Sequence, residues 1–325
     1  MTKTKQVNSP LKTYSSSRIR GIVVSIFASL LRYVFLIAFS YILLYPLIYI
    51  LTHAFRAGVD TTDPTVVWIP KNLSWEPMQK AIELMDLPNS LFSTLKFEVV
   101  SAIISTATCG VAAYGMARFQ FKGRAILNVI LILTILIPAS IVLIPNYMNF
   151  YDFNPFGIVH LIEDIFKTDL NTSLLNTVWT FWLPALTGVG IRAGFYIYIY
   201  MQFYKGLPKE LEEAAWVDGC GPWMTYLRIV VPSSGVSVLT VFMLSVIWHW
   251  NDYYNALMYI SDGTTMAVNL SNFVSALKLF DGTAGTLTTD APMSACLIFL
   301  LPVLIMYICL QKRFITSIAS TGIVG

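Results

Sequence analysis

Long apolar segments alternate with short polar ones along the chain. Each apolar segment is close to the roughly 20 residues that an α-helix needs to cross the hydrocarbon core of a membrane. Segments of this kind occupy residues 33–55, 91–117, 125–145, 175–201, 233–257 and 291–311. The pattern predicts an all-α membrane protein with six transmembrane helices.

Prolines lie inside four of these segments, at Pro46, Pro138, Pro184 and Pro302. A proline removes a backbone N–H and breaks a lone helix in water, whereas neighbouring helices in a membrane bundle can satisfy the freed backbone groups. We therefore expect bent or interrupted helices. The apolar stretch 21–31 either extends the first helix or lies along the membrane surface.

The composition supports this membrane assignment. Hydrophobic residues make up 56% of the 325 residues, charged residues make up 12%, and the mean hydropathy is +0.66. Ordinary soluble domains are only about 45–50% apolar. The net charge of +3 is too small to favour a nucleic-acid partner. The four cysteines have no metal-ligand spacing and no P-loop or HExxH motif is present, so we expect neither catalysis nor a bound metal in this chain.

The positive charges predict an orientation. If the N-terminus lies inside the cell, the inside-facing segments hold fourteen of the 21 lysines and arginines, and the outside-facing segments hold five. Basic residues are enriched in the cytoplasmic loops of membrane proteins. The first apolar segment is too long for a cleaved signal peptide. We therefore expect both termini in the cytoplasm.

One inside-facing segment, residues 202–232, stands out because it holds all the acidic residues on that side. Pro208 suits the first turn of a helix, Gly219 can take the left-handed conformation that closes it, and Pro222 can start a second helix. A helix of about three turns is marginal in water and gains stability by packing against something. The segment is therefore either a docking surface for a cytoplasmic partner or a solvated connector. Its acidic residues are Glu210, Glu212, Glu213 and Asp218.

The spacing within this segment resembles the EAA signature of ABC importer permeases. The signature runs EAA, three residues, G, nine residues, I, any residue, L, P, and only Val231 departs from it, with Val in place of Leu. In that family the loop forms a coupling helix that docks into a cleft on the ATP-hydrolysing subunit. The resemblance assigns this role to Glu213, Ala214, Ala215, Gly219, Ile229 and Pro232.

Further stretches resemble the carbohydrate branch of these permeases, and in particular the six-span MalG-like subunit of maltose-type importers. They are residues 202–215, 89–91, 250–257 and 311–325. Family members commonly have Arg where this chain has Met201. The resemblance implies a type I ABC importer permease fold and import of a sugar or oligosaccharide.

The same resemblance implies the partners and the layout of the chain. We expect a second homologous permease subunit, two copies of a cytoplasmic ATPase that carry ATP and Mg, an extracytoplasmic sugar-binding protein and the lipid of a bacterial-type plasma membrane. The expected parts are a cytoplasmic N-terminal segment at 1–32, a first transmembrane helix at 33–55, an extracytoplasmic loop at 56–90, a five-helix core at 91–311 with its coupling loop at 202–232, and a cytoplasmic tail at 312–325.

Polar residues inside the predicted spans are candidates for a substrate pathway. Trp250, Asn251 and Asp252 suit sugar rings and hydroxyls, but an aromatic belt at the membrane surface explains them equally well. Glu98 and Arg192 also lie within spans. A direct pair between them requires a broken helix, and otherwise Arg192 extends toward the inner interface while Glu98 lies near the outer headgroups.

A secondary transporter is the main alternative function, because six spans with Gly and Pro breaks suit that class. Such a protein works without an ATPase and does not need the EAA-like loop.

Overall fold

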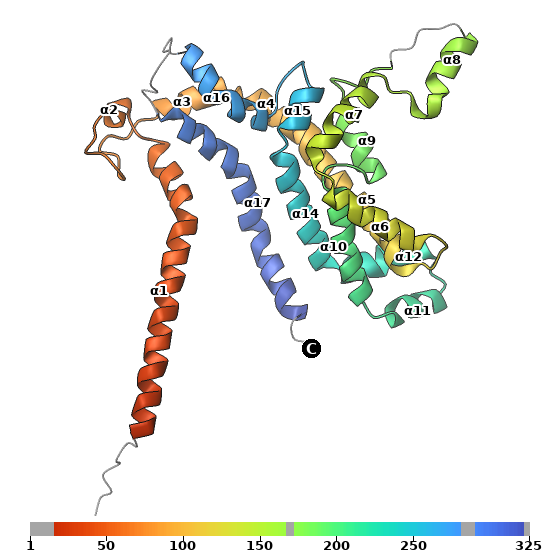
Figure 1. The fold of residues 1–325 in the computed structure, drawn as a ribbon, viewed down its shortest axis with the longest axis horizontal. Helices are drawn as coiled ribbons and strands as arrows, with labels where there is room; N and C mark the ends of the chain where they lie inside the picture. Colours follow the sequence, from red (N-terminus) through yellow and green to blue (C-terminus); the bar gives the residue numbers. More distant parts are fainter. Residues whose placement is uncertain (1–15, 167–171, 281–289, 322–325) are drawn as a thin grey trace, which may run out of the picture.

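The computed structural model describes residues 16–166, 172–280 and 290–321, and this part of the chain is helical without a β-strand. The helices form an elongated body with one long helix standing beside it (Figure 1). Its main members are α1 (Ser16–His53), α3 (Glu76–Leu84), α4 (Leu87–Thr94), α5 (Val100–Arg118), α6 (Arg124–Leu136), α7 (Ala139–Tyr151), α9 (Trp179–Thr187), α10 (Ala193–Gly206), α14 (Gly235–Trp250), α16 (Met266–Phe280) and α17 (Ala291–Thr321).

Shorter elements connect these helices. The π-helix η1 (Leu95–Val99) joins α4 to α5, so that the chain is helical without interruption from Leu87 to Arg118. The remaining short elements are α2 (Gly58–Thr61), η2 (Pro155–Gly157), α8 (Ile158–Phe166), α11 (Glu210–Val217), α12 (Pro222–Thr225), η3 (Tyr226–Val230), α13 (Val231–Ser233) and α15 (Tyr254–Tyr259).

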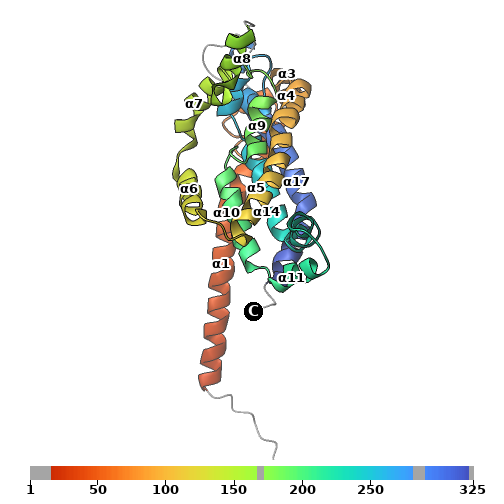
Figure 2. The ribbon, with the colours of Figure 1, turned by 90° about the vertical axis from the view of Figure 1, so that its right-hand side faces the viewer.

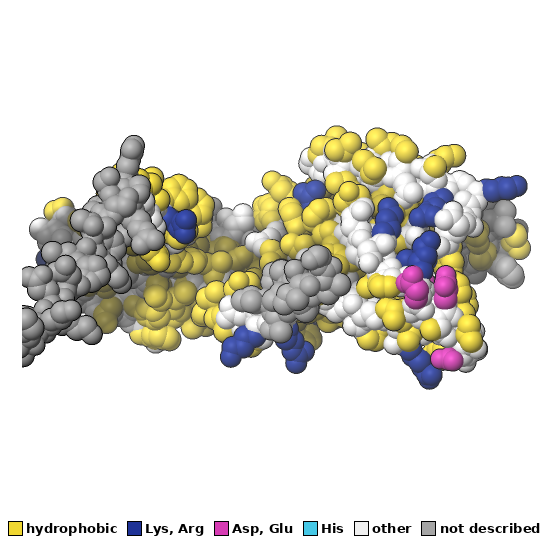
Figure 3. Space-filling view, turned by 90° about the horizontal axis from the view of Figure 1, so that it is seen from below, with side chains coloured by type: hydrophobic (Ala, Val, Ile, Leu, Met, Phe, Trp, Pro, Cys, Tyr) yellow, Lys and Arg dark blue, Asp and Glu magenta, His cyan; other side chains and the backbone are white. Residues whose placement is uncertain are grey.

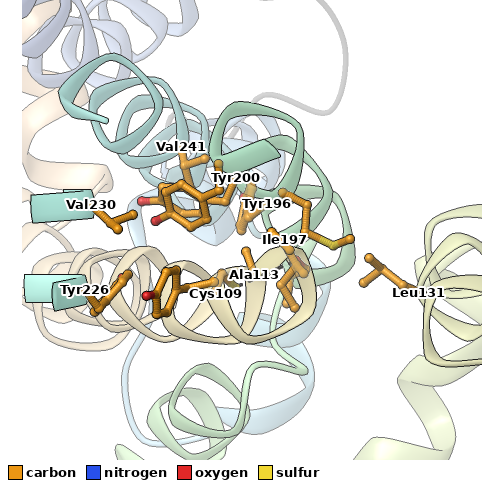
Figure 4. Close-up of a cluster of buried hydrophobic side chains, with 14 residues drawn as sticks. Cys109, Ala113, Leu131, Tyr196, Ile197, Tyr200, Tyr226, Val230 and Val241 are labelled. Atoms are coloured by element: carbon orange, nitrogen blue, oxygen red, sulfur yellow. Dashed lines mark hydrogen bonds between the residues drawn. The ribbon is translucent and has the colours of Figure 1, made fainter. Parts of the chain in front are cut away.

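Helix α5 lies at the centre of the body and packs against α9, α10 and α14. Tyr196, Tyr200 and Tyr204 repeat every four residues along α10 and are almost fully buried against it. Gly110 of α5 makes room for tyrosine side chains, because a Cβ there would lie 3.3 Å from the Tyr204 hydroxyl and 2.7 Å from the Tyr226 hydroxyl. Figure 4 shows Tyr196 and Tyr200 in one cluster with Cys109 and Ala113 of α5. The cluster fixes α10 on α5 along most of its length.

A layer of short helices crosses one end of the body, which we call the α16 end (Figure 1). Helices α3 and α16 pack there against the start of α17, and α4 packs against α3 and α16. The backbone N–H of Met266 donates to Thr94 Oγ1 at 2.9 Å, and Asn269 Nδ2 donates to the Met85 carbonyl at 2.6 Å. The opposite end carries α11 and α12, and we call it the α11 end.

Helix α1 stands apart from the body for most of its length (Figures 1 and 2). It meets the body at its C-terminal end, where Arg56 Nε pairs with Asp290 and His53 Nδ1 lies 3.4 Å from the same carboxylate. Asp290 immediately precedes α17, so this group of residues ties α1 to α17, and we call it the α1–α17 clamp. The side chains of Arg56 and Asp290 are only 12% and 15% exposed.

The predicted spans are recovered in part. In the described residues three helices are long and apolar enough to cross a membrane, Val23–His53, Leu87–Arg118 and Ala291–Arg313. Two bent pairs add one span each if counted whole, Arg124–Leu136 with Ala139–Tyr151 at 101° and Pro222–Ser233 with Gly235–Trp250 at 83°. The stretch 21–31 extends the first helix, and α17 continues through the predicted tail as far as Thr321.

The fourth predicted span, residues 175–201, is divided between α9 and α10, and neither half alone is long enough to cross the membrane. The expectation of interrupted helices is confirmed, but prolines cause few of the breaks. Pro138 lies between α6 and α7, whereas Pro46, Pro184 and Pro302 lie inside continuous helices. The total of six spans and the positions of the termini remain predictions.

Candidate functional site

The EAA-like segment forms the far tip of the α11 end (Figure 1). Helix α11 begins at Glu210, where the backbone N–H groups of Glu212 and Glu213 both donate to the Lys209 carbonyl at 3.0 Å. Its eight residues make just over two turns, which is shorter than the three turns expected. Pro208 lies just before the helix and not in its first turn, and Pro222 begins α12 as predicted.

Gly219 closes α11 in the left-handed conformation that the sequence predicts, with φ at +83°. The N–H of Gly219 donates to the Trp216 carbonyl at 3.0 Å, and the N–H of Cys220 donates to the Ala215 carbonyl at 2.9 Å. These two bonds form a Schellman motif, which satisfies the last carbonyls of the helix. A Cβ at Gly219 would meet no atom within 4 Å, so the need for glycine comes from the backbone alone.

The EAA-like residues do not gather into one contact. Ala215 is buried beneath α11 and Ile229 is half-buried, whereas Glu213, Ala214, Gly219 and Pro232 are exposed. The signature therefore combines positions that support the helix from below with positions that face outward. Their predicted role in ATPase coupling stays a prediction.

A buried ion pair that the sequence analysis missed holds α11 on the body. Arg118 Nε lies 2.6 Å from Glu212 Oε1, and these side chains are only 7% and 6% exposed. The Tyr114 hydroxyl donates to Glu212 Oε2 at 3.2 Å, and Arg118 Nη2 donates to the Leu207 carbonyl at 2.8 Å. Buried charges are stable only when paired and hydrogen-bonded. We call Tyr114, Arg118, Glu212 and Leu207 the α5–α11 clamp.

The clamp fixes α11 to the end of α5, although α10 precedes it in the chain. The sequence showed basic Arg118 and acidic Glu212 on the same predicted side of the membrane, but it also showed other acids and bases there. Charge alone could not select this pair, because the choice depends on how α5 and α10 pack.

The outward side of the segment is unusually apolar for a charged loop. Val217 is 89% exposed and Trp223 is 59% exposed. Figure 3 views this end from below and shows acidic and basic side chains set close together among hydrophobic ones. Exposed aromatic and apolar side chains beside charged groups are typical of surfaces that bind another protein. The exposed apolar residues are Leu211, Trp216, Val217, Trp223, Met224 and Leu227.

The candidate pathway residues Trp250, Asn251 and Asp252 do not converge on one point. Trp250 is 3% exposed, and its Nε1 donates to the Phe299 carbonyl at 3.1 Å, so its ring packs between helices. Asn251 Nδ2 donates to the Ile247 carbonyl at 2.8 Å. The Asp252 carboxylate accepts from Asn255 at 3.0 to 3.3 Å. Their part in a substrate pathway stays a prediction.

Glu98 and Arg192 do not pair with each other. Glu98 lies in η1, is 1% exposed, and its carboxylate accepts no hydrogen bond from the residues that the structure describes. Arg192 is exposed, and its guanidinium carbon lies 4.3 Å from the centre of the Trp248 ring. The helix break that such a pair would need is present between α9 and α10, but Arg192 there turns to an aromatic ring.

Comparison with known proteins shows which family this chain resembles. A family model for binding-protein-dependent transport system inner membrane components matches residues 107–320. The chain is 27% identical to the probable ABC transporter permease protein YurM of Bacillus subtilis, over 90% of this chain and 88% of that protein. It is also 27% identical to the melibiose/raffinose/stachyose import permease protein MelC of the same organism, over 86% of this chain and 91% of that one.

A solved structure has a similar fold. It is the crystal structure of a bacterial ABC transporter involved in the import of the acidic polysaccharide alginate. The match has a TM-score of 0.62 and 23% sequence identity, and it covers 94% of this chain and 100% of the matched chain.

Proposed function

Since the chain belongs to the family of binding-protein-dependent transport system inner membrane components, we propose that it forms part of the membrane pathway of an ABC importer for a sugar or oligosaccharide. The chain is a permease subunit and not an enzyme, and ATP is hydrolysed on a separate subunit in such systems. The name of the relative MelC supports a carbohydrate cargo, because MelC is a melibiose/raffinose/stachyose import permease.

The α11 end is the proposed contact with the ATPase. The observation that carries this proposal is a short helix that offers exposed apolar side chains outward and is held from behind by a buried ion pair. A partner that seats on Trp216, Val217 and Trp223 removes their apolar surface from water, which favours binding. Movement of that partner then passes to α5 through Arg118 and Glu212.

The proposed orientation puts the α11 end in the cytoplasm, because the positive charges favour that side. The α16 end then faces the external binding protein. A second homologous permease subunit completes the pathway, and two ATPase copies carry ATP and Mg. The long apolar surface of α1 is free to meet lipid and this second subunit.

Gly219→Val tests the contact with the ATPase. A left-handed backbone costs a residue with a side chain about 1–2 kcal/mol, so the end of α11 should rearrange. We expect normal insertion into the membrane, weaker copurification of the ATPase in mild detergent and at least a tenfold loss of sugar-stimulated ATP hydrolysis. Glu213→Ala should have the same effect to a smaller degree, because it removes only one exposed charge.

Gly221→Val is the matched control. Gly221 lies two residues further on in an extended conformation, with φ at −72° and ψ at 168°, and a Cβ there meets no atom within 4 Å. Valine readily adopts this extended conformation, which is also the one favoured for a residue that precedes a proline, here Pro222. Equal activity of the Gly219 and Gly221 variants would contradict the proposed role of α11. A secondary transporter, the alternative class, would import its substrate without any bound ATPase.

A further inference from the structure

The gap between α9 and α10 is a fixed break in a membrane helix. Gly188 has φ at +72° and Arg192 has φ at +55°, so the chain turns sharply between them. Thr108 Oγ1 donates to the Ala185 carbonyl at 2.7 Å, and the same carbonyl accepts the Gly188 N–H at 3.3 Å, so this end of α9 is hydrogen-bonded to α5. On the other side of the turn, a Cβ at Gly194 would lie 2.4 Å from Thr134 Oγ1, which shows how closely α6 packs there.

The break is packed from behind but open on its other side. Val189 is 74% exposed, and Arg192 and Trp248 are exposed beside it. The Arg192 guanidinium rests over the Trp248 ring at 4.3 Å. Guanidinium groups stacked on a ring keep their in-plane N–H donors free for other partners. No carboxylate of the described residues lies within ion-pair distance of Arg192.

Arg192 lies too deep in the predicted span for its side chain to reach the inner membrane interface. The predicted span ends at residue 201, so nine residues of α10 separate Arg192 from the inner interface and rise about 14 Å, roughly half of a hydrocarbon core about 30 Å thick. That depth argues against the expected extension of Arg192 toward the inner interface, and the structure shows its guanidinium over the Trp248 ring instead. A charged side chain at such depth faces a water-filled cavity or a partner group and not lipid, and it marks substrate pathways.

We propose that Arg192, held on Trp248 at the break between α9 and α10, is a subsite on the translocation pathway that binds the carboxylate of an acidic saccharide. Discontinuous membrane helices form substrate sites because their ends present polar groups in mid-membrane. The planar guanidinium offers two parallel N–H donors that match a carboxylate, and the start of α10 adds the positive end of a helix dipole. A neutral sugar leaves that charge uncompensated.

This inference rests on the proposed function and narrows its cargo to sugars that carry carboxylates. The whole transporter, with its ATPase and binding protein, is reconstituted in vesicles and supplied with labelled oligomers of galacturonate or of mannuronate and guluronate. The matched substrates are the same oligomers with each carboxylate reduced to a primary alcohol. Wild-type protein should import at least one acidic oligomer tenfold faster than its reduced counterpart.

Three variants then test the site itself. Arg192→Gln should lower uptake of the acidic oligomer at least tenfold and leave uptake of the reduced oligomer unchanged, and Arg192→Lys should keep an intermediate rate because it retains the charge without the planar fork. Lys96→Gln is the control, because it removes another cation that rests on an aromatic ring, 4.9 Å from the centre of Phe97. It should not change the preference between the two oligomers.

Several outcomes overturn the proposal. The subsite is wrong if the wild-type protein takes up acidic and reduced oligomers equally fast. It is also wrong if Arg192→Gln takes up the acidic oligomer at the wild-type rate. If Arg192→Gln instead lowers assembly with the second permease subunit and slows both substrates equally, Arg192 pairs with a carboxylate of that subunit. The proposed function fails separately, when wild-type vesicles import no saccharide of either kind in an ATP-dependent way.

Discussion

The α5–α11 clamp and the α1–α17 clamp use the same chemistry at opposite ends of the molecule. Each pairs one arginine with one carboxylate, Arg118 with Glu212 and Arg56 with Asp290, in a place that water scarcely reaches. Each also draws on a third side chain, the Tyr114 hydroxyl in one and the His53 ring in the other.

The elements that the two clamps join are different. The α1–α17 clamp links the ends of two long helices that also pack against each other. The α5–α11 clamp holds a helix of eight residues whose outer side is exposed and whose other contacts are with α12 and η3. Since a short helix is marginal on its own, α11 depends on its ion pair more than α1 or α17 does on theirs.

This difference shows that the effect of losing an ion pair depends on the other contacts between the helices that the pair joins. Losing a partner at the α16 end should weaken the structure, because the joined helices stay close through other contacts. Losing a partner at the α11 end should change where α11 lies, and the proposed docking surface with it.

Charge reversal at the α5–α11 clamp should have the largest effect. Breaking a buried ion pair from one side costs about 3–5 kcal/mol, because the remaining charge is uncompensated. We expect Arg118→Glu and Glu212→Arg each to lower ATP-driven uptake at least tenfold while the protein still inserts. The double exchange restores opposite charges and should recover much of the activity. Wild-type uptake by either single variant would show that the clamp does not position α11.

Asp290→Asn at the α1–α17 clamp should have a smaller effect of another kind. It removes the negative charge beside Arg56 and His53 but keeps the shape of the side chain. We expect the midpoint of thermal unfolding in detergent to fall by a few degrees, with uptake within about threefold of wild type. A tenfold loss of uptake at unchanged stability would remove the contrast between the two clamps.

The smallest effect on activity should come from single cysteines that report the orientation. Thr62 lies beside α2 at the α16 end and Lys122 lies in the turn between α5 and α6 at the α11 end, and both residues are exposed. The native cysteines, including exposed Cys309, are first replaced. In intact cells an impermeant thiol reagent should label the cysteine at position 62 and spare the one at 122. The reverse pattern would place α11 outside the cell.

The sequence predicts helical segments and local closure well. Apolar length located the long helices, because the cost of exposing backbone groups to lipid leaves a spanning segment few other conformations. Gly219 was predicted in its left-handed conformation, because few other residues tolerate that backbone. Both inferences depend on neighbouring residues in the chain.

Features that depend on how helices pack together could not be predicted from the sequence. Residues 175–201 look like one continuous span, yet the helix ends at Thr187, beyond Pro184. There Thr108 of α5 and the Gly188 N–H both donate to the Ala185 carbonyl. Trp250 suits a sugar ring when judged from the sequence, but in the structure its indole N–H donates to the Phe299 carbonyl of α17. The Arg118–Glu212 pair likewise exists only because α5 and α10 lie side by side.

The length of α1 has a consequence for the lipid around it. Its apolar part, Val23–His53, has 31 residues and so measures about 46 Å, against a hydrocarbon thickness of about 30 Å. A helix so much longer than the bilayer meets the mismatch by tilting strongly or by thickening the surrounding lipid. The thickness of the bilayer thus sets the tilt of α1 relative to the membrane normal. Because the α1–α17 clamp joins the end of α1 to the start of α17, a change in that tilt moves the start of α17 as well.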